Sequence, residues 1–212
     1  MRGVLPKPSV IDTRHEYGGL FSIYEWLTVG VAAIVVGLVL FALVRYRSGR
    51  GGPPNGRSEA KVGESVYAVV LAVIAAGLVA ATFHTESRVD PLAANPKLRV
   101  RITAFDWQWR FDYPNGRSAV GRPGRPAVLV VPARKEIEFE ETSRDVVHSF
   151  WVPSLRFKRD AFPNRTTRFD LVFDRTGVFP GRCAEFCGLH HADMTFRVRV
   201  LAPAEFDAWS RG

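Results

Sequence analysis

The sequence predicts a membrane α-helical hairpin of two transmembrane helices, followed by an all-β sandwich. Three observations carry this prediction: two long apolar runs within the first 83 residues, short segments of alternating apolar and polar residues after Pro96, and turns rich in Gly and Pro between those segments. Of the 212 residues, 47% are hydrophobic and 24% are charged, which excludes a disordered or collagen-like chain. The formal net charge is +8, and a basic balance of this kind first suggests nucleic-acid binding.

Both apolar runs have the length of a membrane span. Residues 19–44 contain one charged residue, Glu25, and residues 66–83 contain none. At about 1.5 Å rise per residue, eighteen helical residues extend roughly 27 Å, close to the hydrocarbon thickness of a bilayer. The alternative is a pair of buried core helices, but soluble cores rarely contain uncharged runs of this length. A cleaved signal peptide is not expected, because mostly polar residues precede the first run and the run itself is too long.

The loop between the two runs sets their orientation. Residues 45–61 carry five basic residues and one acid, Glu59, so the positive-inside bias makes this loop cytoplasmic. The expected domains are residues 1–90, which contain the hairpin, and residues 91–212, exported to the outer face. The expected location is a bacterial plasma membrane or an equivalent energy-transducing inner membrane. The basic charge is thus a topology signal, and nucleic-acid binding loses its main support.

The exported part is expected to be an antiparallel sandwich. Residues 97–104 and 195–202 alternate with period two, as half-buried strands do. Strands at this spacing, with no helices between them, are typical of a sandwich. Further strands are expected at residues 127–131, 136–141, 146–152, 167–173 and 178–182, and a short terminal helix is expected at 203–209.

The residues that carry chemistry lie close to one another in the sequence near the C-terminus. Cys183, Cys187, His191 and Met194 fall within the stretch GRCAEFCGLHHADM, and His148 precedes them at the end of an expected strand. Two thiolates, two imidazoles and a thioether form a soft donor set that prefers copper. A plain disulfide and a Cys₂His₂ zinc site are the alternatives.

The number of cysteines bears on the kind of copper site. A single blue-copper centre needs one Cys, two His and a weak axial Met, so the second cysteine is surplus to that plan. Two thiolates can instead bridge two copper ions, with His148 and His191 each completing one metal. No position is left open for a substrate, so this site is expected to transfer electrons.

The stretch Gly181–Met194 and the upstream HSFWVP of residues 148–153 resemble subunit II of haem–copper cytochrome c oxidases. The resemblance implies a cupredoxin-like fold with a binuclear copper centre, CuA, bridged by the two cysteines. His148 and Met194 would complete one metal, and His191 with the backbone carbonyl of Glu185 would complete the other. The Glu185 side chain would reach a magnesium or manganese ion at the boundary with subunit I.

The same resemblance assigns roles outside the copper site. It makes Trp107 the residue at which electrons enter, with Trp109 close by; both could instead be ordinary sandwich or interface aromatics. It makes residues 158–163 a stretch that packs on subunit I. Glu64 would lie at the mouth of a proton channel shared with subunit I, although an acid at a helix N-terminus is also favoured by the macrodipole.

Together these features predict the subunit through which electrons enter a proton-pumping terminal oxidase. The expected partners are the haem-bearing subunit I, subunit III, a cytochrome c and the membrane, but no nucleic acid. The chain has no Cys-x-x-Cys-His motif, so no fused cytochrome c domain is expected. Its spans also lack the histidines that haem and an oxygen-site copper would need, so the oxygen-reducing site is expected in a partner. A membrane-tethered copper chaperone is a rival, but its thioredoxin-like fold would need alternating strands and helices. The same domain could also feed a nitric oxide reductase, whereas quinol oxidases lack these copper ligands.

The charge of the exported half raises a question about the electron donor. Residues 84–212 hold 21 basic and 16 acidic residues, a net +5, whereas this family usually docks a basic cytochrome c through acidic residues. The candidate acidic patch contains Glu136, Glu138, Glu140, Glu141 and Asp145. Our hypothesis is a donor that is acidic or neutral, or that is held in a supercomplex, so that steering by opposite charge matters less.

Overall fold

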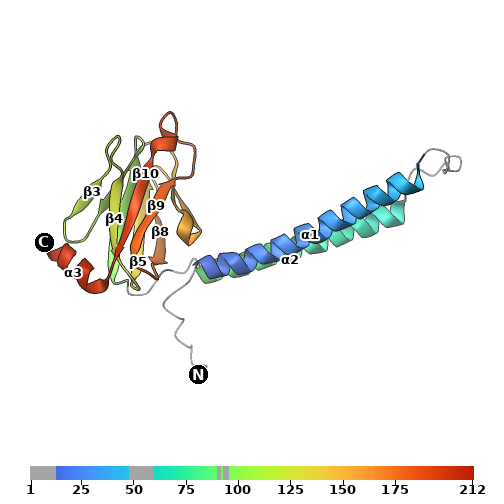
Figure 1. Ribbon diagram of the computed structural model, residues 1–212, viewed down its shortest axis with the longest axis horizontal. Coiled ribbons are helices and arrows are strands. Elements are labelled where there is room, and N and C mark those ends of the chain that lie inside the picture. The colour runs from blue at the N-terminus through green and yellow to red at the C-terminus, as the bar shows by residue number, and fades with distance from the viewer. Residues whose placement is uncertain (1–12, 48–59, 90–91, 93–95) are drawn as a thin grey trace, which may run out of the picture. The chain divides into compact units, whose positions relative to one another are not determined.

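The computed structural model describes residues 13–47, 60–89, 92 and 96–212 (Figure 1). Most of the predicted cytoplasmic loop 45–61 therefore lies outside the described residues. The chain divides into two compact units, one formed by His15–Ser87 and the other containing Arg88–Gly212. We describe each unit by itself.

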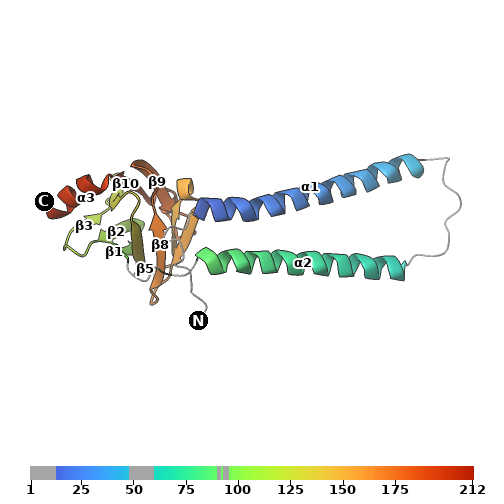
Figure 2. The ribbon, with the colours of Figure 1, turned by 90° about the horizontal axis from the view of Figure 1, so that it is seen from below.

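The first unit is a hairpin of two long helices, α1 (Thr13–Arg45) and α2 (Lys61–Val89). Figure 2 shows the two helices running in opposite directions. The hydroxyl oxygens of Tyr24 and Thr82 lie 2.9 Å apart and join the helices by a hydrogen bond. Because the Thr82 hydroxyl already donates to the carbonyl of Leu78, Tyr24 is the donor in this bond. The hairpin thus contains a polar contact between two otherwise apolar helices.

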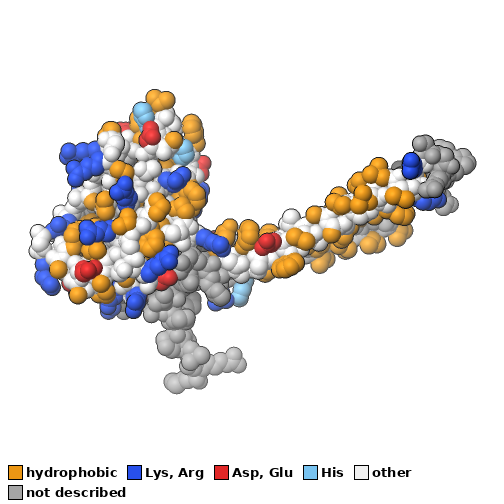
Figure 3. All heavy atoms as spheres, viewed as in Figure 1, with side chains coloured by type: hydrophobic (Ala, Val, Ile, Leu, Met, Phe, Trp, Pro, Cys, Tyr) orange, Lys and Arg blue, Asp and Glu red, His pale blue; other side chains and the backbone are white. Residues whose placement is uncertain are grey.

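Both helices are long and apolar enough to cross a membrane. No residue of either apolar window is buried, so these are not the core helices of a soluble domain. Figure 3 shows many hydrophobic and few charged side chains along the hairpin. Both helices are longer than the predicted apolar runs 19–44 and 66–83. The additional residues at their ends include polar ones that are also helical. The prediction of two candidate spans is confirmed.

The second unit is a sandwich of two five-stranded sheets. The first sheet has the order β3-β2-β1-β5-β8, and the second has the order β4-β10-β9-β6-β7. The strands of the first sheet are β1 (Leu98–Phe105), β2 (Gln108–Asp112), β3 (Ser118–Val120), β5 (Glu136–Ser143) and β8 (Thr167–Val172). Those of the second are β4 (Ala127–Pro132), β6 (His148–Val152), β7 (Phe157–Ala161), β9 (Gly177–Cys183) and β10 (Thr195–Leu201).

The prediction of a purely antiparallel sandwich is wrong. β1 pairs in parallel with β5, and β4 pairs in parallel with β10, while the other pairs are antiparallel. Alternation of apolar and polar residues reports which face a side chain occupies but not the direction of the neighbouring strand. Three strands, β2, β3 and β7, were not predicted. Strand β3 was missed because it is very short, and β7 because it carries the charged sequence FKRDA.

Aromatic side chains fill the space between the sheets. Phe150 stacks on Phe196 with ring centroids 4.6 Å apart, and Trp109 packs edge-on against both rings. Gly181 on β9 leaves the room that the Phe196 ring occupies, because a Cβ at this position would overlap it. This close packing holds β9 against β10, the two strands that flank the cysteine-bearing loop.

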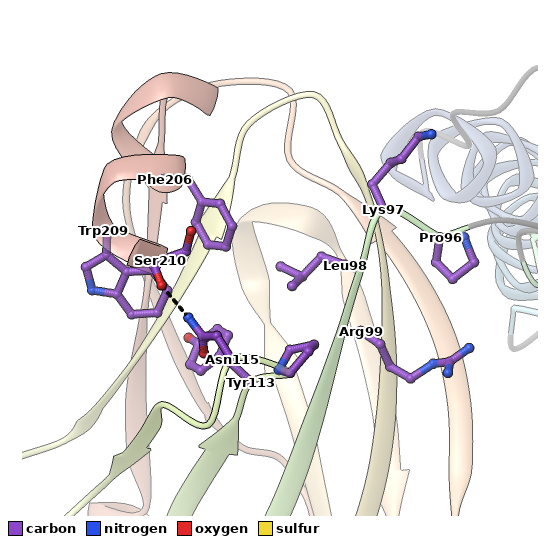
Figure 4. Close-up of a pocket in the computed structure, with 10 residues that line it drawn as sticks. Pro96, Lys97, Leu98, Arg99, Tyr113, Asn115, Phe206, Trp209 and Ser210 are labelled. Atoms are coloured by element: carbon purple, nitrogen blue, oxygen red, sulfur yellow. Dashed lines mark hydrogen bonds between the residues drawn. The ribbon is translucent and has the colours of Figure 1, made fainter. Parts of the chain in front are cut away.

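The terminal helix α3 (Pro203–Arg211) confirms the predicted helix 203–209 and is slightly longer. Glu205 accepts a hydrogen bond from the backbone N–H of Ala202 at 3.1 Å, which caps the first turn. Figure 4 shows Phe206 and Trp209 lining a cavity of about 590 Å³ together with residues of β1 and the turn after β2. No candidate metal ligand lines this cavity.

Candidate metal centre

The candidate copper ligands converge at one end of the sandwich. His148 begins β6 and Cys183 ends β9, while Cys187 lies in the following loop. His191 opens a single 3₁₀ turn (His191–Asp193), and Met194 directly precedes β10. The backbone N–H of Cys183 donates to the carbonyl of Met194 at 2.9 Å, so the ladder of β9 and β10 closes the base of this loop. The topology thereby brings the predicted donors together.

The two sulfur atoms form the middle of the cluster. Their Sγ atoms lie 3.8 Å apart, well beyond the roughly 2.05 Å of a disulfide bond, and both cysteines are free and buried. A metal–thiolate bond measures about 2.3 Å, so one ion can reach both sulfurs at this separation. The geometry therefore fits two thiolates bridging metal and does not show the disulfide alternative.

The remaining donors surround this sulfur pair. The Cys183 Sγ lies 3.9 Å from Nδ1 of His148. The Cys187 Sγ lies 3.5 Å from Nδ1 of His191 and 3.8 Å from Sδ of Met194. The ligand atoms of His148, Cys183 and Cys187 all fall within 4.8 Å of one another, and all three residues are buried. The donor set is soft and dense, as a copper site requires.

Glu185 presents two different groups to two different surroundings. Its backbone carbonyl lies 3.2 Å from the Cys183 Sγ and points into the cluster. Its carboxylate points away and lies 3.4 Å from Nζ of Lys158, which also pairs with Asp160 at 3.0 Å. The carbonyl is therefore placed to act as a copper ligand, while the carboxylate remains available at the surface.

Asp145 orients His148 and was missed as a site residue in the sequence analysis. Its Oδ1 lies 2.8 Å from Nε2 of His148, which leaves Nδ1 facing Cys183. Burial would lower the pKa of His148, but its hydrogen bonds to Cys183 and Asp145 outweigh burial and raise it. A carboxylate on the far nitrogen of a ligating histidine fixes the ring and raises its basicity. The spacing Asp-x-x-His was the signal available in the sequence.

The two thiols are electrostatically unequal. Burial would raise the pKa of Cys183, but hydrogen bonds, first among them the one from His148, lower it below the ordinary thiol value. Burial and the neighbouring Cys183 thiolate both raise the pKa of Cys187. One thiolate thus forms readily, and the second needs a nearby positive charge. A bound cation supplies that charge, which supports a metal site here.

Trp107 lies directly beside the cluster. It occupies the two-residue turn between β1 and β2 with a φ of +64°, an uncommon conformation for a large side chain. Its Nε1 donates to the carbonyl of Cys187 at 3.0 Å, and its ring packs edge-on against His190 at 4.9 Å. The backbone N–H of Asp106 donates to Asp145, so one carboxylate ties this turn to His148. The half-buried indole therefore connects the protein surface with the cysteine loop.

Trp109 has a different environment. It is fully buried between the sheets, and its ring lies 6.4 Å from the His148 ring. Its surroundings are those of a core aromatic that supports a ligand, not of a surface residue. Of the two tryptophans, only Trp107 reaches solvent.

Glu64 belongs to the helical unit and lies in the first turn of α2. Its carboxylate accepts a hydrogen bond from the backbone N–H of Ala60 at 3.2 Å. A contact of this kind is also favoured for an acid at a helix N-terminus.

The predicted acidic patch is wrong. Glu138 is buried and accepts hydrogen bonds from Arg99 and Arg168 on the neighbouring strands. Glu141 points into the core, and Asp145 is engaged with His148. Glu136, Glu138 and Glu140 share the outer face of β5, where arginines of β1 and β8 pair with Glu138 and Glu140. These residues do not form a free acidic surface.

Comparison with known proteins identifies the family. The family model described as "Cytochrome C oxidase subunit II, periplasmic domain" matches residues 125–201, which contain every side-chain donor of the cluster. A probable cytochrome c oxidase subunit 2 of Streptomyces avermitilis is 32% identical over 82% of this chain and 67% of its own length. The chain belongs to the cytochrome c oxidase subunit II family.

Other members of the subunit II family agree with this assignment. A cytochrome c oxidase subunit 2 of Alkalihalophilus pseudofirmus is 31% identical over 91% of this chain, which spans 56% of that relative. The crystal structure of the periplasmic domain of subunit II of cytochrome oxidase from Bradyrhizobium japonicum matches with a TM-score of 0.52. It is 30% identical and covers 57% of this chain and 95% of its own. The match confirms the cupredoxin-like sandwich, and the family places it outside the membrane.

Proposed function

We propose that this subunit II receives electrons from a cytochrome c at a binuclear CuA centre and delivers them to haem in subunit I, where oxygen is reduced to water. The observation that carries the proposal is the convergence of two free thiols, two imidazoles and a thioether at one end of the sandwich. Copper bound there supplies one-electron redox chemistry. The protein holds the donors in place, and the sandwich buries both sulfurs.

The roles of the ligands follow the distances. We assign Cys183 and Cys187 as bridging thiolates, and His148, His191 and Met194 as terminal ligands, together with the Glu185 carbonyl. The core around Phe150 and Trp109 fixes β6 and therefore His148. A rigid ligand set reduces the reorganisation that each electron transfer requires. Trp107 is the residue at which we expect electrons to enter, because its ring is partly exposed and its Nε1 contacts the Cys187 carbonyl.

The finer assignments concern the rest of the complex. We assign the Glu185 carboxylate to a magnesium or manganese ion at the boundary with subunit I, since it points away from the copper ligands. Subunit III completes the expected complex, and Glu64 is assigned to the cytoplasmic mouth of a proton channel. The membrane is that of a bacterial cell or an equivalent energy-transducing inner membrane.

The groove beside Trp107 bears on the electron donor. A cavity of about 550 Å³ is lined by Trp107 and His190. Two arginines, Arg122 and Arg125, and two exposed acids, Asp106 and Asp193, also line it. This cavity therefore carries charges of both signs. On the face of the β domain shown in Figure 3, basic side chains outnumber acidic ones. This distribution supports a donor that is acidic or neutral, or that is held in a supercomplex, because the predicted acidic residues do not form a patch that could steer a basic one.

The proposal is tested on the exported domain. A matching periplasmic domain from Bradyrhizobium japonicum crystallises by itself, so residues 90–212 are a reasonable fragment to express and load with copper. Metal analysis should give two coppers per chain, with a mixed-valence EPR spectrum. One copper, or zinc alone, would overturn the assignment. Glu185→Gln should leave the copper spectrum nearly intact, because the carbonyl and not the carboxylate faces Cys183.

A further inference from the structure

The cysteine loop contains two consecutive histidines whose rings have different neighbours. Nδ1 of His191 faces the Cys187 sulfur at 3.5 Å. The ring of His190 packs instead against the indole of Trp107, with centroids 4.9 Å apart and planes 76° from parallel. Among the described residues this is the only ring contact of Trp107. One histidine of the pair therefore serves the metal centre, and the other serves the indole.

The backbone that carries the indole is not one that its own residues favour. Asp106 and Trp107 form the turn between β1 and β2, and both have positive φ, +35° and +64°. Two-residue turns of this kind favour Asn-Gly, because a side chain makes a positive φ costly. The Asp106 N–H donates to Asp145, and Nε1 of Trp107 donates to the Cys187 carbonyl. The place of the indole therefore depends on contacts made outside its own turn.

The cysteine loop is shaped to receive the indole. Gly188 has a φ of +111°, and a Cβ there would lie 3.4 Å from Nε1 and 3.5 Å from Cζ2 of Trp107. The loop backbone is closed by its own hydrogen bonds, since the His191 N–H donates to the Gly188 carbonyl at 3.1 Å. The Asp193 N–H likewise donates to the His190 carbonyl at 3.0 Å. The backbone at His190 is thus held independently of its side chain, which is 54% exposed.

We infer that His190 is a positioning residue for electron entry, because its ring holds the Trp107 indole against the Cys187 carbonyl and so sets the rate of copper reduction. The inference rests on the proposed function, in which the ferrous haem of the donor gives one electron to the oxidised copper centre and becomes ferric. Electronic coupling falls steeply with distance, so a small displacement of the indole slows this step. An edge-on ring contact fixes both the distance and the angle of the indole.

The test compares His190→Ala, which removes the ring, with His190→Phe, which keeps a ring but no imidazole. Leu189→Ala is the matched control, because it shortens an 85% exposed side chain of the same loop. In the assembled oxidase, stopped-flow reduction by rising concentrations of reduced, succinylated cytochrome c, an acidic probe, separates the limiting rate from the half-saturating concentration. His190→Ala should lower the limiting rate about tenfold, with the half-saturating concentration and the copper EPR spectrum unchanged. His190→Phe and Leu189→Ala should keep the wild-type limiting rate.

Several results would overturn the inference. It fails if His190→Ala is reduced as fast as the wild type, or if only its half-saturating concentration changes, because the ring would then contact the donor directly. It also fails if His190→Phe is as slow as His190→Ala, or if Leu189→Ala is equally slow. A changed copper spectrum in His190→Ala would show that the ring holds the metal loop and not the indole. In contrast, a wild-type rate in Trp107→Phe, or an oxidase without two coppers in this chain, would refute the proposed function itself.

Discussion

Replacing Glu141 by Leu is expected to stabilise the β domain. This carboxyl group lies on the inner face of β5, paired in register with Ile102 and Thr167, and it is completely buried. Among the described residues neither of its oxygens has a hydrogen-bond partner of normal geometry. A buried polar group without a partner costs about 1–3 kcal/mol, and Leu fills a similar volume without that cost. The free energy of unfolding should therefore rise by about 1–3 kcal/mol.

The gain should depend on pH. Burial first, and then the nearby charge of Asp160, raise the pKa of Glu141 well above 4.5, although Arg159 opposes this. Between the ordinary value and the raised value the native state binds the proton and the unfolded state does not. Native stability then falls as pH rises, by at most about 1.4 kcal/mol per pH unit. Glu141→Leu lacks this titration, so its advantage over the wild type should widen as pH rises above the ordinary value.

Urea unfolding of the copper-free exported domain, followed by tryptophan fluorescence at several values between about pH 5 and pH 8, measures both effects. Glu140→Gln is the matched control, because this side chain lies on the outer face of the same strand. The control should change stability by less than about 0.5 kcal/mol. A Glu141→Leu variant that is less stable than the wild type would refute the reasoning, as would a difference that stays constant with pH.

Three further predictions concern the sandwich and the site. Gly181→Ala should lower the free energy of unfolding by about 1–3 kcal/mol, because its methyl group would overlap the Phe196 ring; urea unfolding measures the loss, and an unchanged midpoint would contradict it. Trp107→Phe should retain both coppers by metal analysis but slow reduction by cytochrome c in stopped-flow traces, since the Nε1 contact to the loop is lost. Asp145→Asn should weaken copper binding about 10–100-fold in chelator competition, because the carboxylate that orients His148 is gone; equal affinity would refute that role.

The metal centre was predictable from the sequence because most of its donors are close neighbours in the chain. Cys183, Cys187, His191 and Met194 occupy one loop, so their spacing already limits how far apart they can lie. The distant ligand, His148, stood out because it lies in a segment of strand-like composition, although it begins β6 and does not end it. The hairpin was predictable for a different reason, since long uncharged runs have few uses in soluble proteins.

Features that depend on pairing between strands were not predictable. Alternation in EIEFEE places Glu136, Glu138 and Glu140 on one face and Glu141 on the other, but it does not reveal which strands lie alongside. Only the pairing of β5 with β1 and β8 shows that arginines neutralise Glu138 and Glu140. The expected acidic surface failed for this reason. The link from Asp106 through Asp145 to His148 is likewise formed by tertiary contact.

The hydrogen bond from the Cys183 N–H to the Met194 carbonyl closes the cysteine loop at its base. The residues between these two lie outside the strands, so the sheets do not depend on them for pairing. The loop supplies Cys187 and His191, whereas the sheets supply His148 from β6, so the two parts of the site come from separate parts of the fold. A loop of different length or ligand content, attached at the same two residues, is expected to change which metal is bound while the ten strands keep their pairing. The same separation gives natural variation a route to new redox properties that leaves the fold intact.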